Sequence, residues 1–356
     1  MTASRLWIAM VLVLMCACSR PTTKVESVEL GAKPAGTPVS LDAPLGLPPV
    51  PVPADRPLTK EVIALGEKLY FSPLLSIDQT ISCASCHDPR KGFADGQPVS
   101  TGVKGKKGNR SAPTVINAAY AAPMFWDGRA ATLEAQAAGP IVNPVEMAHS
   151  VEGVEKSVGA NAELRAMFVA AYGEAPAGQS PVNMQRITSA IAAFERTVLR
   201  GNSPFDRYQY GGDKSALSPA AIHGLAVFRD VKKGNCAVCH TIDEEYALFT
   251  DNKFHNLGAG MNPEGELTDA GRFVVTNQEA DMGAFRTPTL RNIAETAPYM
   301  HDGSLKTLKD VVDFYVGGGN ANRHLDKEIK SLSHLTRQER ADLVAFMESL
   351  TGEAPK

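Results

Sequence analysis

The chain of 356 residues is long enough for two ordinary domains. Its formal net charge of −3 excludes the strong positive charge that is typical of nucleic-acid-binding proteins, so no nucleic-acid partner is expected.

The N-terminal residues are typical of an export signal. Arg5 precedes an apolar run over residues 6–15, which is too short to span a bilayer and has the length of a signal-peptide core. The alanine before Cys18 resembles a bacterial lipoprotein cleavage site, although the two residues before that alanine are not typical of one. We therefore expect residues 1–18 to be a signal peptide and the protein to reach the periplasm. Lipid anchoring through Cys18 and simple secretion both stay open.

A proline-rich segment follows. Residues 19–57 hold nine of the 24 prolines, so this stretch is extended and not helical. It is either a tether from the membrane or an arm that lies on the protein surface. Beyond it, helical patterns alternate with loops rich in glycine and proline, without sustained strand alternation. The clearest helices are predicted over Lys60–Phe71, Met184–Leu199 and Arg337–Leu350.

Two Cys-x-x-Cys-His motifs carry the chemistry: Cys83 and Cys86 with His87, then Cys236 and Cys239 with His240. In a c-type haem site two thiols bond to the porphyrin vinyl groups and the adjacent histidine ligates the iron. Zinc or disulfide chemistry is the weaker alternative for two motifs of identical spacing. The other two of the six cysteines lie in the leader, so none is left for a structural disulfide.

The sequence also repeats itself. The motif R-x-P-T-x-x-N occurs at residues 286–292, and a version one residue longer occurs at 110–117. An x-D-G turn and a Thr-Leu pair follow each copy, so both halves have the same order of motifs. Glycine-rich breaks near residues 201–213 separate the halves. We predict an all-α fold of two tandem cytochrome c-like haem domains with long loops, over residues 58–205 and 206–356.

This order of motifs resembles the bacterial dihaem cytochrome c peroxidases and their relatives of the MauG type. The resemblance covers about residues 45–352. It is carried by the segments LGLPP from Leu45, FWDGR from Phe125, NPVEM from Asn143 and PYMHDG from Pro298.

The resemblance implies that the first haem, with His87 as proximal ligand, reacts with hydrogen peroxide. Peroxidases of this family that need reductive activation have a second ligating histidine sixteen residues later, where this chain has Val103. Valine cannot ligate iron, so we expect an open first haem. Glu146 matches the distal glutamate that moves a proton during peroxide cleavage, and Gln136 matches a distal glutamine. Without the resemblance, a solvated carboxylate and a surface amide would be the ordinary interpretations.

For the second haem, on His240, ordinary peroxidases use a methionine fourteen residues after the histidine of the H-D-G turn. This chain has Tyr315 there, and tyrosine is the mark of the MauG type. A phenolate is a hard anionic donor that stabilises higher oxidation states, whereas methionine raises the haem potential. The alternatives are a tyrosine of the core and a methionine ligand, for which the candidates are Met261, Met282 and Met300.

Two further roles come from the resemblance. Trp126 occupies the position between the haems, where an indole can pass an electron, although a large core aromatic is the simpler interpretation. The family also binds a calcium ion between its domains, at positions that match Ser111, Thr296 and Pro298 here. The family has asparagine where this chain has Ser111, so the match is incomplete; a hydroxyl is a weaker oxygen ligand.

The resemblance implies a MauG-like dihaem enzyme that uses hydrogen peroxide to reach a doubly oxidised dihaem state. That state would then oxidise a partner, usually a side chain of a periplasmic protein. The alternative is a dihaem cytochrome c peroxidase that takes electrons from a small cytochrome c or copper protein. A third hypothesis is a dihaem electron carrier without catalysis. The expected cofactors are two covalent c-type haems and one calcium ion.

Overall fold

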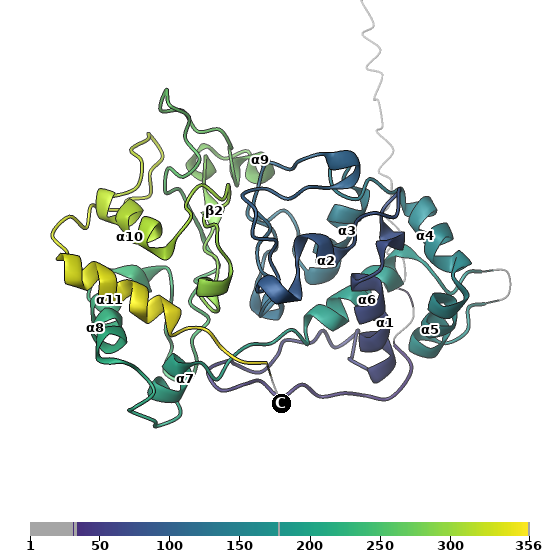
Figure 1. Ribbon diagram of the computed structural model, residues 1–356. Helices are drawn as coiled ribbons and strands as arrows, with labels where there is room; N and C mark the ends of the chain where they lie inside the picture. Colours follow the sequence, from purple (N-terminus) through teal and green to yellow (C-terminus); the bar gives the residue numbers. More distant parts are fainter. Residues whose placement is uncertain (1–30, 32–33, 177–178, 355–356) are drawn as a thin grey trace, which may run out of the picture.

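The computed structural model describes residue 31 and residues 34–176 and 179–354 (Figure 1). The expected signal peptide and Cys18 lie outside this part of the chain. Within it the protein is mostly helical, as predicted. The strands β1 (Phe254–His255) and β2 (Phe285–Arg286) are two residues long and pair antiparallel. No helix in the described ranges has the length and apolar character that a membrane crossing requires.

Eleven α-helices and seven 3₁₀ turns are described. The helices of the first half are α1 (Lys60–Tyr70), α2 (Cys83–Cys86), α3 (Leu133–Val142), α4 (Val151–Ala160), α5 (Ala162–Tyr172) and α6 (Met184–Glu195). Those of the second half are α7 (Pro204–Gln209), α8 (Pro219–Arg229), α9 (Phe273–Thr276), α10 (Leu308–Gly317) and α11 (Arg337–Glu348). The 3₁₀ turns are η1 (Pro73–Leu75), η2 (Pro89–Lys91), η3 (Val103–Gly105), η4 (Ala118–Tyr120), η5 (Cys236–Val238), η6 (Glu279–Asp281) and η7 (Ile293–Glu295).

The three clearest helix predictions are confirmed. They correspond to α1, α6 and α11, whose starts match the predicted ones. Helix α6 ends four residues early, because the amide and hydroxyl of Thr197 both bond to the carbonyl of Phe194 and tighten the last turn. Helix α11 begins where expected, because Thr336 and Glu339 form a capping box.

Buried apolar side chains form two clusters, one within residues 58–198 and one within residues 205–350. Figure 1 shows the two halves side by side, with the first in purple to teal and the second in green to yellow. Each cluster includes a pair of crossing helices, α1 with α6 and α8 with α11. A Cβ on Gly66 would lie 1.8 Å from the carbonyl oxygen of Ala190, and a Cβ on Gly224 would lie 1.9 Å from that of Asp342. The same close crossing at glycine therefore occurs in both halves.

The sequence repeat is also a structural repeat. Thr132 caps α3 and Thr307 caps α10, each with its hydroxyl oxygen accepting from a backbone amide of the first turn. The x-D-G turns before these helices are closed by matching antiparallel bridges, Met124 with Ala130 and Tyr299 with Leu305.

The described part of the proline-rich segment is an arm that lies against both halves. Figure 1 shows it in purple, passing below the two cores. The carbonyl of Pro48 accepts from the Tyr120 hydroxyl (2.8 Å) in the first half. In the second half, the carbonyl of Gly46 accepts from Arg291 Nη2 (2.5 Å). Arg291 is 1 % exposed and also pairs with Asp206 at 2.9 Å, so the arm is attached to a buried charged group.

Candidate haem sites

Each half contains a cavity lined by its own Cys-x-x-Cys-His motif. The first has a volume of about 640 Å³ and is lined by Cys83, Cys86 and His87. The second has a volume of about 370 Å³ and is lined by the second motif, from Cys236 to His240. The cavities share part of their walls, because four residues line both: Arg286, Pro288, Ile293 and Tyr299. Each cavity therefore offers two thiols and an imidazole to one bound group.

Backbone carbonyls orient the two histidines. The Nδ1 atom of His87 lies 3.3 Å from the carbonyl oxygen of Phe93, and that of His240 lies 2.8 Å from the carbonyl oxygen of Phe249. A proton on Nδ1 is shared with this carbonyl, which leaves Nε2 as the ring atom available to iron. Burial lowers the pKa of both imidazoles, so the neutral, ligating form is favoured.

The repeated R-x-P-T-x-x-N motif positions these carbonyls. The hydroxyl of Thr114 donates to the carbonyl of Gly92 (2.6 Å), directly before Phe93. The hydroxyl of Thr289 donates in the same way to the carbonyl of Leu248 (2.7 Å), directly before Phe249. The threonine of each motif thus fixes the loop that orients the histidine of its own half. The thiols, the oriented imidazoles and the two cavities fit one covalently attached haem in each half.

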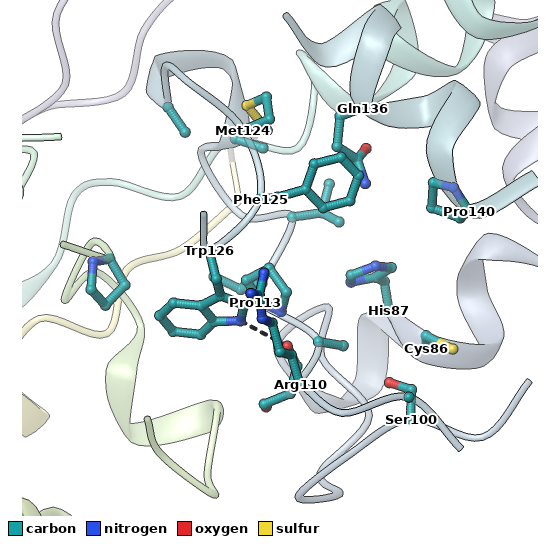
Figure 2. Close-up of a pocket in the computed structure, with 18 of the residues that line it drawn as sticks. Cys86, His87, Ser100, Arg110, Pro113, Met124, Phe125, Trp126, Gln136 and Pro140 are labelled. Atoms are coloured by element: carbon teal, nitrogen blue, oxygen red, sulfur yellow. Dashed lines mark hydrogen bonds between the residues drawn. The ribbon is translucent and has the colours of Figure 1, made fainter. Parts of the chain in front are cut away.

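The first cavity brings Glu146 and Gln136 together with His87. Figure 2 shows Gln136 descending from α3 toward the space that contains His87 and Phe125. The carboxylate of Glu146 accepts a hydrogen bond from Asn143 Nδ2 at 2.6 Å. Burial raises the pKa of Glu146, while this hydrogen bond and the charge of Arg129 oppose the rise. Glu146 is therefore a half-buried carboxyl in the cavity wall and not a fully solvated one.

Val103 is 1 % exposed and is not among the residues that line the first cavity. Its amide donates to the carbonyl of Glu146 (2.8 Å), so the segment expected to hold a ligand in activation-dependent relatives supports the glutamate loop instead. Met124 and Met147 line the cavity and are the candidates for a sixth ligand there, which the sequence reasoning did not consider.

The second cavity is lined by Tyr315 from α10. Burial raises the pKa of this phenol, and its hydroxyl makes no hydrogen bond within the described ranges. Of the rival methionines, Met300 lines this cavity, whereas Met261 and Met282 are not among its lining residues. Met347 from α11 also lines it and was missed, because its place in an amphipathic helix gave it the pattern of a core residue.

Trp126 lies in the wall of the first cavity, next to the second half. Its Nε1 donates to the carbonyl of Ser111 (2.8 Å), drawn as a dashed line in Figure 2. Its own carbonyl accepts from the amide of Arg286 (2.8 Å), which belongs to β2 of the second half. This position is compatible with both roles considered for the indole, a packing aromatic and an electron relay.

The three residues matched to a calcium site border the same cavity. Ser111, Thr296 and Pro298 all line the first cavity. Neither the carbonyl of Thr296 nor that of Pro298 accepts a backbone hydrogen bond in the part of the chain that the structure describes. Carbonyl and hydroxyl oxygens are the hard oxygen donors that calcium prefers.

Three charged residues of the cavities were not singled out from the sequence. Glu195 lines the first cavity, is 6 % exposed, and has its pKa raised to about 8 by burial. His255 lines the second cavity between Asp326 (2.6 Å) and Asp251 (3.0 Å). Arg286 lines both. The repeated motif contains Arg286, but nothing in the sequence signals that its side chain lies in the shared wall.

Comparison with known proteins agrees with this geometry. The family model described as "Di-haem cytochrome c peroxidase" matches residues 60–215, and the "Cytochrome c" model matches residues 223–351. The chain is 39 % identical to methylamine utilization protein MauG of Methylorubrum extorquens, over 85 % of this chain and 82 % of that protein. It is 38 % identical to cytochrome-c peroxidase IdrP1 of Denitromonas iodatirespirans, over 88 % and 87 %.

Among solved structures, a MauG-like protein associated with microbial copper homeostasis is similar over 88 % of this chain and 96 % of that one. The TM-score is 0.78, with 34 % sequence identity. Relatives named as MauG and relatives named as peroxidases match to similar extents, so the comparisons support two c-type haems and peroxide-using redox chemistry. The chain belongs to the family of dihaem cytochrome c peroxidases and MauG proteins.

Proposed function

We propose that this protein is a MauG-like enzyme: peroxide reacts in the first cavity, and the oxidising equivalents are used on a partner protein. A haem held by one histidine supplies an iron to which peroxide can bind and which can give up electrons. The two halves would be tandem cytochrome c-like units, each built around its own cavity. The predicted signal peptide places the protein in the periplasm, with lipid anchoring at Cys18 as an open part of the proposal.

In the first cavity, Glu146 would take a proton from bound peroxide and return it to the leaving oxygen. Its raised pKa suits this exchange, because a carboxyl of ordinary acidity holds a proton too weakly near neutral pH. Asn143 holds one carboxylate oxygen, which leaves the other free to act. Gln136 would orient peroxide from α3, and Trp126 would carry electrons between the halves.

The observation that carries the MauG assignment is the position of Tyr315 in the second cavity, which His240 also lines. Tyr315 is half-buried, and its hydroxyl has no hydrogen-bond partner among the described residues, so it is free to bind a group in the cavity; a metal cation is a strong partner for the deprotonated form. Phenolate ligation lowers the potential of the second haem and makes that haem a poor acceptor of electrons from a small cytochrome.

The test compares Tyr315→Phe and Tyr315→Met with Tyr299→Phe. Tyr299 is a suitable control, because it lines the same cavity and its hydroxyl is already bonded to the carbonyl of Ile293 (3.0 Å). Tyr315→Phe should change the low-spin electron paramagnetic resonance signal of the second haem. Tyr315→Met should raise its midpoint potential and speed its reduction by a small cytochrome c. The control should do neither.

An unchanged spectrum in Tyr315→Phe would refute tyrosine ligation. One observation favours the second candidate function, an ordinary cytochrome c peroxidase: Met300 and Met347 also line this cavity. If replacing either methionine by leucine converts the second haem to high spin while Tyr315→Phe does not, the peroxidase becomes the better assignment. Two low-spin haems without any reaction with peroxide would favour the electron carrier.

Calcium binding at Ser111, Thr296 and Pro298 is part of the proposal, supported by their place in the lining of one cavity and by the free carbonyls of Thr296 and Pro298 in the described ranges. Removing calcium with a chelator should weaken the contact between the halves. Added calcium should reverse the change. The chelator should have no effect on a Ser111→Val variant, because that variant is expected to have lost its affinity for calcium. A protein with no bound calcium and no response to the chelator would remove this part of the proposal.

A further inference from the structure

Arg286 carries a guanidinium group in the wall between the two cavities, without a carboxylate partner in the described ranges. Its Nε is buried and has no hydrogen-bond partner there. Its Nη1 donates to two neutral oxygens, the side-chain oxygen of Asn252 (3.2 Å) and the carbonyl of Thr287 (3.3 Å). The described part of the chain therefore places a cation at this wall with no anion paired to it.

The sequence repeat provides an internal comparison. Arg110 begins the R-x-P-T-x-x-N motif of the first half, as Arg286 begins that of the second. Arg110 pairs with Asp127 at 2.6 Å and with Asp269 at 2.7 Å. Among the described residues, the same motif position thus has two carboxylate partners in one half and none in the other. The lack of a counter-ion at Arg286 is not a property of the motif.

An uncompensated guanidinium in a protein wall is unfavourable, because its donors lose water without gaining acceptors. Burial by itself lowers the pKa of Arg286 to about 10, with no opposing charge from a neighbour. Such a group is stabilised when a planar oxyanion accepts its hydrogen bonds, since guanidinium and carboxylate pair through two parallel hydrogen bonds.

We propose that Arg286 binds a propionate carboxylate of one of the two haems. The inference rests on the cavities being haem sites, and it goes beyond the proposed reaction. A porphyrin brings two propionates, on the edge away from the vinyl groups that the cysteines would hold. The Arg286 amide is bonded to the carbonyl of Trp126, so the pair would connect a haem edge to the backbone of the residue between the haems.

The test is a spectroelectrochemical titration of both haems in the holoprotein between pH 5 and 9, for wild type, Arg286→Gln and Arg286→Lys. Arg272→Gln is the control. Arg272 lies at the same boundary between halves, donates to the carbonyls of Asp127 and Gly128 (2.8 and 2.9 Å), and lines neither cavity. It therefore corrects for the loss of one positive charge nearby.

In wild type the paired propionate should stay ionised over this range, so the midpoint potentials should change little with pH. In Arg286→Gln the propionate should titrate between pH 5 and 9. The potential of its haem should then fall as pH rises, with a slope that approaches one proton per electron. The haem that gains this slope identifies the propionate, whether it belongs to the first or the second cavity. Arg286→Lys should keep a nearly flat profile.

Profiles of Arg286→Gln that match those of Arg272→Gln at both haems would overturn the proposal. If Arg286→Gln does not yield holoprotein, Arg286→Lys decides through resonance Raman spectra. Its propionate bending bands should shift from wild type, because an ammonium cannot form two parallel bonds, and unshifted bands would overturn the pairing. Neither failure affects the Tyr315 variants, which test the proposed function separately.

Discussion

In the proposed reaction, the hydrogen bond between Asn143 and Glu146 would set the pH range in which the first cavity reacts with peroxide. If Glu146 accepts the first proton, the rate of reaction is full above its pKa and is lost as pH falls through it. Burial raises that pKa, so the loss should begin at a higher pH than for an ordinary carboxyl. The Asn143 amide stabilises the carboxylate form of Glu146. The reaction rate should therefore fall at a lower pH than burial alone would give.

Asn143→Ala should raise the pH at which the rate falls. A hydrogen bond to a charged group contributes about 1.5–3 kcal/mol, and about 1.4 kcal/mol corresponds to one pKa unit. Because Glu146 is only half-buried, we expect the lower end, about one pH unit. Asn143→Asp keeps the oxygen that accepts from the Val145 amide (3.1 Å) and places a like charge beside Glu146. It should therefore raise the pH at which the rate falls by more than Asn143→Ala does.

The measurement is stopped-flow mixing of the ferric holoprotein with peroxide from pH 4.5 to 9, with the exposed Glu152→Gln as the control carboxyl. Glu146→Gln should slow the reaction about 10²–10⁴-fold and abolish the loss of rate at low pH. If the rate falls at the wild-type pH in both Asn143 variants, another group must be the one that titrates. Glu195 would then be the next candidate in the cavity wall. A normal rate in Glu146→Gln would return Glu146 to a structural role.

Three further predictions concern stability and ligation. Gly66→Ala should destabilise the holoprotein by about 1–3 kcal/mol in chemical denaturation, because its Cβ would meet a backbone oxygen at 1.8 Å. Gly159→Ala, whose Cβ would meet nothing closer than 3.9 Å, should stabilise it by about 0.4–1 kcal/mol, and equal effects would contradict the crossing geometry. Arg291→Met should cost about 3–5 kcal/mol by leaving Asp206 buried without its partner, and a neutral result would show that the pair is dispensable. The ferric protein should show one high-spin haem in electron paramagnetic resonance, and two low-spin signals would point to Met124 or Met147 as a ligand of the first.

The sequence predicted what local spacing and repetition encode. The Cys-x-x-Cys-His motifs, the capped helices and the repeated loop each leave a short pattern, and the structure has all of them. The proximity of Glu146 and Gln136 to His87 was available only through the family resemblance, because the residues come from separate elements. Arg286 and Glu195 could not be found, because a buried unpaired charge has the same sequence appearance as a solvated one. The pattern shows which residues are present, while the counter-ions around them depend on the tertiary fold.

The arm that crosses both halves constrains the order in which the protein is assembled. Gly46 precedes its partner Arg291 by 245 residues, so it is synthesised long before the guanidinium that holds it. The contact of the arm with the second half can therefore form only after Arg291 has been synthesised. Other contacts between the halves, such as the pair of Arg110 with Asp269, do not involve the arm and need a shorter length of chain. The arm can therefore attach to the first half, through Pro48 and Tyr120, before it attaches to the second, and its docking on both halves is completed late in folding.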